Sequence, residues 1–275
     1  MKKQVMNFLS IALMALVLFS CGGGSGKKGS GGKSLFTPVS SGHPYEMLVV
    51  IDKDMWERPA GRALFNALDM DVPGLPQPER SFRISQIIPD KFERGFRIFR
   101  NIIDVDIQPI YTQPKLKYSR DSYASPQMIM TIQAPDEASF EEFVNQNKQV
   151  IVDFFTKAEM NRQINLLKEK YSDVVATKVG SMFGCDVRVP VGFERYKQGK
   201  DFFWTSEDRP GSEVSMNFVV YSYPYTDKNT FTRDYFIHKR DSVMKLNIPG
   251  SLEGQYMATD TNYVNVREFS IKGEY

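Results

Sequence analysis

Met128–Phe155 reads MIMTIQAPDEASFEEFVNQNKQVIVDFF, and this stretch decides the predicted fold. Its first six residues, MIMTIQ, are apolar and β-branched enough to form a buried strand. Pro135 closes the strand, and Asp136 is a good helix N-cap because its carboxylate can accept a hydrogen bond from a free backbone N–H. Apolar residues then recur on one helix face at Phe140, Phe143, Val144, Ile151, Phe154 and Phe155. The stretch predicts a strand that turns into a long amphipathic helix, which continues or restarts as far as Tyr171.

The order strand, turn, helix is predicted twice more. Glu46–Ile51 (EMLVVI) is a buried strand, followed by helical spacing of apolar residues in Ala60–Leu68. Val214–Tyr221 is a second strong strand, and a helix capped by Thr230 follows over Phe231–Leu246. The three units do not align as a sequence repeat. Because several strand pairs look hairpin-linked, the predicted fold class is α+β, with mixed, largely antiparallel sheets and packed helices.

Other segments of the first half carry weaker patterns. Strands are expected where apolar residues alternate or cluster, at Phe82–Ile88 and Ile102–Ile107. A helical period is expected from Phe92, Phe96 and Phe99. The polar stretch Lys115–Pro126 predicts an exposed crossing between elements.

The second half of the chain opens with the apolar runs Val174–Val179 and Asp186–Val189. Phe202–Trp204 predicts a buried strand. The sequence ends with an expected hairpin, formed by Tyr256–Thr261 and Val264–Lys272 around Asn262. Because the chain stops at Tyr275 directly after this strand, a missing C-terminal element stays open.

The N-terminus reads as an export signal. Lys2 and Lys3 precede the largely apolar Val5–Phe19, which is too short for a comfortable membrane span and suits a secretory signal. The signal ends in Leu18-Phe19-Ser20-Cys21, a pattern similar to a bacterial lipobox. The sequence predicts a signal peptide over residues 1–20 and a lipid on the thiol of Cys21, and the alternative is an ordinary cleaved signal with a chance cysteine.

A tether is expected after the signal, over residues 21–43. Gly22–Lys33 is almost wholly Gly, Ser and Lys, a composition that cannot bury apolar surface. The rest, 44–275, is expected to be one globular α+β region, with sub-domains near 44–172 and 173–275 as an alternative.

Charge and cysteine content exclude some classes. The chain has 35 Lys+Arg and 33 Asp+Glu, and the loss of Lys2 and Lys3 with the signal leaves 33 of each. This balance argues against a dedicated nucleic-acid binder. Of the two cysteines, lipidation of Cys21 leaves Cys185 alone, so no intramolecular disulfide is expected, and Cys185 is expected to be a buried, inert thiol.

No motif for catalysis, a cofactor or a metal is found. The chain has two histidines, with His43 at the end of the tether and His238 on a helix face shared with Asp234. Two histidines and one free cysteine cannot form a usual zinc site. There is no G-x-S-x-G stretch, Walker loop or dinucleotide fingerprint. We therefore expect no cofactor and no metal, and favour a non-enzyme.

Carboxylates and tyrosines are the candidate ligand-binding residues. Asp52 and Asp54 follow the first strand, where α/β sheets often bind ligands, although a polar turn is the alternative. Asp104 and Asp106 alternate on a strand and can face the same side. Tyr221, Tyr223 and Tyr225 can form a platform for sugars or peptides, with a half-buried sheet face as the alternative.

Several segments of the second half resemble an uncharacterised family of lipoproteins from Bacteroidetes-type bacteria: Val189–Phe193, Asp201–Trp204, Arg240–Lys245, Ile248–Ser251 and Tyr256–Thr259. The resemblance extends over nearly all of the mature chain and implies no activity. It implies a Gram-negative envelope, an outer-membrane location, and members that run past the end of this chain. The absence of acids in Gly22–Lys33 favours the periplasmic face.

Two functional hypotheses follow. The first is a membrane-anchored accessory module that holds the lipid membrane through Cys21 and binds an envelope protein, peptide or glycan. The second is an envelope-acting hydrolase with a dispersed active site built from residues such as Asp52, Asp54 and His238. A purely structural role is the third reading.

Overall fold

The computed structural model describes residues 37–75, 77–207, 216–264 and 266. The signal peptide, Cys21 and most of the tether therefore lie outside the described residues. Within the described part, no helix combines the length and apolar character that a membrane span requires.

The first sheet has five strands in the order β2-β1-β3-β5-β4. Its strands are β1 (Glu46–Val50), β2 (Arg83–Ile87), β3 (Asn101–Ile107), β4 (Lys115–Arg120) and β5 (Met128–Ala134). β2, β1, β3 and β5 run parallel, with Val49 opposite Ile103 and Ile103 opposite Met130. β4 is antiparallel to β5 and forms the edge.

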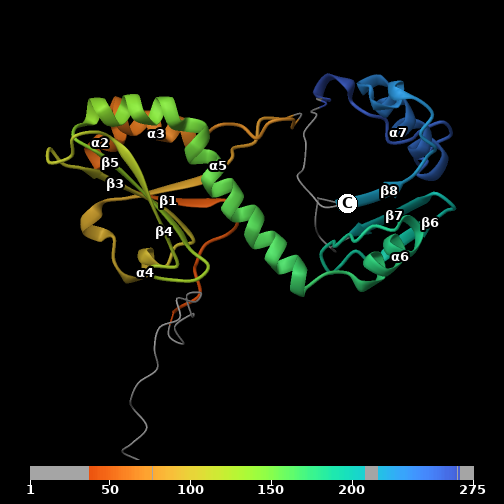
Figure 1. The fold of residues 1–275 in the computed structure, drawn as a ribbon, viewed down its shortest axis with the longest axis horizontal. Coiled ribbons are helices and arrows are strands. Elements are labelled where there is room, and N and C mark those ends of the chain that lie inside the picture. The colour runs from red at the N-terminus through yellow and green to blue at the C-terminus, as the bar shows by residue number, and fades with distance from the viewer. Residues whose placement is uncertain (1–36, 76, 208–215, 265, 267–275) are drawn as a thin grey trace, which may run out of the picture. The chain divides into compact units, whose positions relative to one another are not determined.

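Three helices cover one face of this sheet: α2 (Lys53–Glu57), α3 (Pro59–Leu68) and α5 (Glu137–Glu169). Figure 1 shows α3 and the first part of α5 side by side over the strands. The apolar side chains of these helices meet those of the strands in one core, which includes Leu64, Phe82, Phe140 and Phe155. Alternation along the strands explains this core, because every second side chain points to the helices.

The other face of the sheet is covered by a short segment. The 3₁₀ turn η1 (Pro89–Lys91) and the four-residue helix α4 (Arg94–Arg97) lie in it. Phe92 and Phe99 from this segment pack on a small core of Leu48, Val50, Ile102 and Ile129. The spacing of Phe92, Phe96 and Phe99 predicts a helix, and the structure forms only the single turn α4 in this segment.

The second sheet has three antiparallel strands in the order β6-β7-β8. They are β6 (Arg195–Gln198), β7 (Phe202–Glu207) and β8 (Met216–Tyr221). α6 (Asp173–Phe183) contributes Val175 and Val179 to a core with Phe203 of the sheet. The remaining elements are η2 (Lys228–Phe231), α7 (Arg233–Asn247) and η3 (Thr261–Tyr263).

The predicted fold class is confirmed, since the structure is α+β with one mixed and one antiparallel sheet. The first sheet contains more parallel pairs than the prediction described. The strand and helix of Met128–Phe155 are confirmed as β5 and α5, and Asp136 caps α5 by accepting from the Ser139 N–H at 2.8 Å. α5 continues to Glu169 across a kink at Asn147, whose side chain donates to the Phe143 carbonyl.

One prediction about a segment of the first half is wrong. Lys115–Pro126 is not a simple crossing, because Lys115–Arg120 pairs with β5 along its whole length. The apolar run Val174–Val179, to which the sequence assigns no element, lies in α6, where Val175 and Val179 are one turn apart and both buried.

The end of the chain also differs from the prediction. α7 begins at Arg233, and its cap is Thr232, whose Oγ1 accepts from the Tyr235 N–H, rather than Thr230. No strand forms over Tyr256–Thr261, where Tyr256 makes an isolated bridge with Pro249. Most of Val264–Lys272 lies outside the described residues.

Candidate functional site

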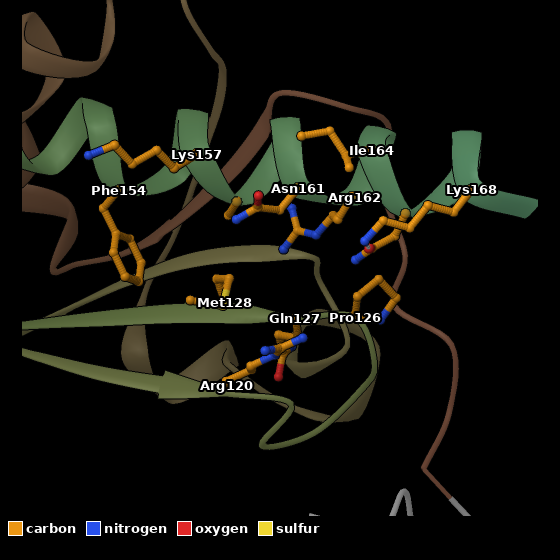
Figure 2. A pocket seen from close by; sticks show the side chains of 12 residues that line it. Arg120, Pro126, Gln127, Met128, Phe154, Lys157, Asn161, Arg162, Ile164 and Lys168 are labelled. Atoms are coloured by element: carbon orange, nitrogen blue, oxygen red, sulfur yellow. Dashed lines mark hydrogen bonds between the residues drawn. The ribbon is translucent and has the colours of Figure 1, made fainter. Parts of the chain in front are cut away.

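A cavity of about 420 Å³ lies between the second half of α5 and the strands β4 and β5. Figure 2 shows α5 on one side of it and the β4–β5 edge on the other. The lining side chains are Arg120, Pro126, Gln127, Met128, Phe154, Lys157, Ala158, Asn161, Arg162, Ile164, Asn165 and Lys168. The volume is within the usual range of small-molecule sites, roughly 300–1,000 Å³.

Helical spacing brings the α5 residues to one side. Lys157, Asn161, Asn165 and Lys168 follow one another at intervals of four, four and three, which places them in one row of the helix. On the strands, Arg120 is paired directly with Met128 across the β4–β5 ladder. Most of the cavity is therefore built from regular elements, and Pro126 and Gln127 come from the loop between β4 and β5.

The cavity is cationic. Four basic side chains line it, and none of its lining residues in the described part of the chain is acidic. Lys168 Nζ donates to Asn165 Oδ1 at 3.1 Å, and Arg120 Nε lies 3.6 Å from Asp121 Oδ2. Lys157 has no hydrogen-bond or ion-pair partner among the described residues.

Behind the cavity lies a buried ion cluster of Arg100, Glu159 and Arg162. Glu159 Oε2 is 2.6 Å from Arg100 Nη2, and Glu159 Oε1 is 2.7 Å from Arg162 Nη1. The three side chains are 15%, 0% and 9% exposed for Arg100, Glu159 and Arg162. Asn101 completes the cluster, because its Nδ2 donates to Glu159 Oε1 and its Oδ1 accepts from Arg162 Nη1, both at 2.7 Å.

The ion cluster holds two guanidinium groups and one carboxylate, so it carries an excess positive charge in a largely buried place. Burial is the largest influence on the pKa of Arg162 and lowers it. The charge of Arg100 also lowers this pKa, and the nearby acids Glu159 and Asp121 act to raise it. Arg100 Nε is buried with no hydrogen-bond partner among the described residues. Buried charge without a counter-charge is costly, and an anion in the cavity beside Arg162 would reduce that cost.

Asp52 and Asp54 lie where the sequence predicts them, after β1. The carboxylate of Asp52 accepts from the N–H groups of Asp54 and Met55, at 2.9 and 3.1 Å, and so caps α2. This is the polar-turn alternative for Asp52, while Asp54 is exposed. Their role as ligands stays a prediction.

Asp104 and Asp106 share one face of β3. Burial, and then the charge of Asp106, raise the pKa of Asp104. Burial also acts to raise the pKa of Asp106, but hydrogen bonds from Tyr111, Gln133 and Gln108 outweigh it and leave this pKa lowered. Among the described residues, no cluster of three or more His, Cys, Asp or Glu side chains suits a metal ion.

The three predicted tyrosines fall into two aromatic groups. Tyr221 stacks on Tyr223 with ring centroids 6.2 Å apart, and Tyr223 meets Tyr235 of α7 at 5.9 Å. Lys239 Nζ lies 5.0 Å from the centre of the Tyr223 ring. Burial raises the pKa of Tyr221, as does the neighbouring Tyr223. This first group is half-buried, as the alternative reading expects.

The second group lies nearer the surface. The ring centroids of Tyr225 and Phe231 are 5.4 Å apart, and those of Phe231 and Phe236 are 6.4 Å apart. Tyr225 and Phe231 are 60% and 61% exposed. The tyrosines are thus brought together with other aromatics, and their binding of a ligand stays a prediction.

The remaining candidates do not form a site. His43 lies near the first sheet and His238 on α7, and both are exposed; no hydrogen bond or ion pair among the described residues joins His238 to Asp234, Asp52 or Asp54. Cys185 is exposed, so the prediction of a buried thiol is wrong. It follows Gly184, the C-cap of α6, whose left-handed φ of 68° ends the helix.

The residues of the cavity were not among those predicted from the sequence. Two signals were present. One signal is a polar row on the predicted helix, formed by Lys157, Asn161 and Lys168. The other is Glu159, which falls one turn after Phe155 on the apolar face of that helix. A carboxylate at a core position indicates a buried counter-charge.

Residues 40–168 match the model of a domain of unknown function, DUF8532, and residues 172–275 match another, DUF4837. The cavity and the ion cluster lie wholly within the first match. No curated protein and no solved structure matches the chain. The two matches are consistent with an uncharacterised family and bring no activity with them.

Proposed function

We propose that the chain is an envelope lipoprotein that binds an anionic group of an envelope molecule in the cavity between α5 and the strands β4 and β5. The observation that carries this proposal is the cationic lining, in which Arg120, Lys157 and Lys168 join Arg162 of the buried ion cluster. Charge-assisted hydrogen bonds to such groups are about twice as strong as neutral ones.

The lining chemistry supports binding over catalysis. Its polar groups are arginine, lysine, asparagine and glutamine side chains. Guanidinium and amide groups neither gain nor lose a proton near neutral pH, so they can hold an anion but are poor general bases. The apolar side chains of Phe154, Met128 and Ile164 add surface for the rest of a ligand.

The proposed anchor rests on the sequence around Cys21. Lys2, Lys3, the apolar Val5–Phe19 and the lipobox-like end fit a lipoprotein signal. The proposed destination is the periplasmic face of the outer membrane, supported by the family resemblance and by the lack of acids in Gly22–Lys33.

The anchor is tested by Cys21→Ala in the native host. We expect the wild-type chain to sediment with membranes and its N-terminal peptide to carry acyl chains in mass spectrometry. The Cys21→Ala chain should lose the acyl mass and the signal cleavage that depends on it. If the wild-type chain sediments with membranes but its N-terminus carries no acyl chain, the proposed anchor is contradicted. Cys185→Ala is the matched control, and it should leave the acylation unchanged.

The cavity is tested by titrating the lipidated protein, in neutral detergent micelles, with inorganic pyrophosphate in a calorimeter. We expect Arg120→Ala/Lys157→Ala to weaken binding by roughly tenfold or more, because each charged hydrogen bond is worth about 1.5–3 kcal/mol. The affinity should also fall as KCl is raised.

The control for this titration is Lys53→Ala/Lys148→Ala, which removes the same charge from the surface of α2 and from the first part of α5. This variant should bind within about twofold of wild type, since neither lysine lines the cavity. Equal weakening in both variants would show that overall charge, and not the cavity, binds the anion.

A further inference from the structure

The described end of the tether is fixed at the rim of the cavity. Val39 forms a parallel bridge with Ser125, Ser40 N donates to the Ser125 carbonyl at 3.2 Å, and Ser125 N donates to the Pro38 carbonyl at 2.9 Å. The next residues after Ser125 are Pro126 and Gln127, which line the cavity. The chain thus enters the first sheet region beside the site.

The ion cluster is connected to the same segment. Arg100 N donates to the Ser41 carbonyl at 3.0 Å, and Arg100 Nη1 lies 3.4 Å from the Gly42 carbonyl. Arg100 also contacts Glu159, which holds Arg162 at the cavity. Arg100 therefore links the two: its backbone N–H and its guanidinium contact Ser41 and Gly42 of the tether, and the same guanidinium contacts Glu159 of the ion cluster.

Covalent geometry limits how far this rim lies from an anchor at Cys21. From Cys21 to Pro38 are 17 residue steps, which span at most about 60 Å when fully extended. A lipid on Cys21 would keep Pro38 within about 60 Å of the membrane surface, which raises the effective concentration of headgroups at the cavity.

The cavity is amphipathic in a way that suits a lipid headgroup. Its lining includes the cationic side chains of Arg120, Lys157 and Lys168. The same lining includes the apolar side chains of Pro126 and Ile164. An anionic phospholipid presents a phosphate joined to an apolar glycerol ester region. Lys and Arg side chains near an anionic membrane surface are attracted to its headgroups.

We propose that the cavity binds the phosphate of an anionic phospholipid in the membrane that anchors the chain. The binding holds the first sheet region against the membrane with the cavity facing the headgroups. This inference rests on the proposed anion-binding function and names the ligand and its source.

The test is hydrogen–deuterium exchange of the lipidated, full chain in nanodiscs. The nanodiscs contain phosphatidylcholine alone, or phosphatidylcholine with phosphatidylglycerol or with oleic acid, an anionic lipid without phosphate. A fourth arm adds inorganic phosphate to phosphatidylcholine nanodiscs. We expect phosphatidylglycerol to slow exchange in 119–128 by about fivefold or more over phosphatidylcholine, and oleic acid and free phosphate to do so by less than twofold.

The variants assign the effect to the cavity. Arg120→Ala/Lys157→Ala should lose the protection by phosphatidylglycerol, and Lys53→Ala/Lys148→Ala should keep it. Equal protection by oleic acid, or protection that survives Arg120→Ala/Lys157→Ala, overturns the proposal. Pyrophosphate binding in the cavity without any effect of phosphatidylglycerol overturns the lipid source but leaves the proposed function standing. Loss of both refutes the two together.

Discussion

Glu159→Ala is expected to destabilise the first sheet region by about 3–5 kcal/mol, because it leaves two buried arginines without their counter-charge. Glu159 is fully buried, with its two oxygens 2.6 Å from Arg100 and 2.7 Å from Arg162. Its loss also removes one of the two acceptors of the Asn101 amide, the other being the Glu46 carbonyl. The cost is therefore mainly that of unpaired buried groups and not of one lost contact.

Urea unfolding measured by tryptophan fluorescence tests this expectation. The chain has two tryptophans, Trp56 on α2 and Trp204 on β7, so a Trp204→Phe background leaves a probe in the first sheet region. Glu169→Ala, at the exposed end of the same helix, is the control and should change the stability by no more than about 0.5 kcal/mol. A similar, small loss for Glu159→Ala would show that the ion cluster is not closed in solution.

A triple variant separates stability from function. Replacing Arg100, Glu159 and Arg162 together by Met, Leu and Met removes all three charges with similar volume. Such replacements of buried ion clusters are often neutral or stabilising. We expect the triple variant to regain most of the stability lost in Glu159→Ala and yet to bind pyrophosphate about tenfold more weakly than wild type. That result would indicate that the cluster serves binding more than folding.

The fold could be predicted where a segment is buried on one side. β5 and α5 were identified because their apolar residues follow the period of a strand and then of a helix. β4 and β6 were missed because both are edge strands, KLKYSR and RYKQ, and edge strands are often rich in charge. The number of parallel pairs was underestimated because a sequence does not show which strands are neighbours.

The candidate site could not be predicted in the same way, because it depends on long-range contacts. Arg100 and Glu159 are 59 residues apart, and Asn101 and Arg162 are 61 apart. In the sequence, Arg100 and Arg162 look like solvated surface residues. Glu159 falls on the apolar face of α5, but the sequence does not show which cations it meets. The tether is a similar case, since the composition of Pro38–Gly42 does not show that it pairs with Ser125 and Arg100.

Phe155→Ala is expected to cost about 3–5 kcal/mol, as for other large-to-small changes in a closed core. Phe155 is fully buried between α5 and the sheet, and its ring meets Phe82 edge-on with centroids 6.4 Å apart. α3 and the strands are held together by the same core, so they cannot easily close around the missing ring. The measurement is the urea unfolding described for Glu159→Ala.

Phe154→Ala is the matched control, because it removes the same side chain one position earlier on the same helix. Phe154 is only partly buried, lines the cavity, and packs on Tyr118 with ring centroids 4.6 Å apart. Water can fill the space it leaves, so we expect a loss of about 1–2 kcal/mol. Equal losses for the two variants would contradict the placement of the core on one side of α5 and of the open cavity beside it. A large loss for Phe155→Ala alone would fix the rotation of α5, and with it the side on which Lys157, Asn161 and Lys168 meet a ligand.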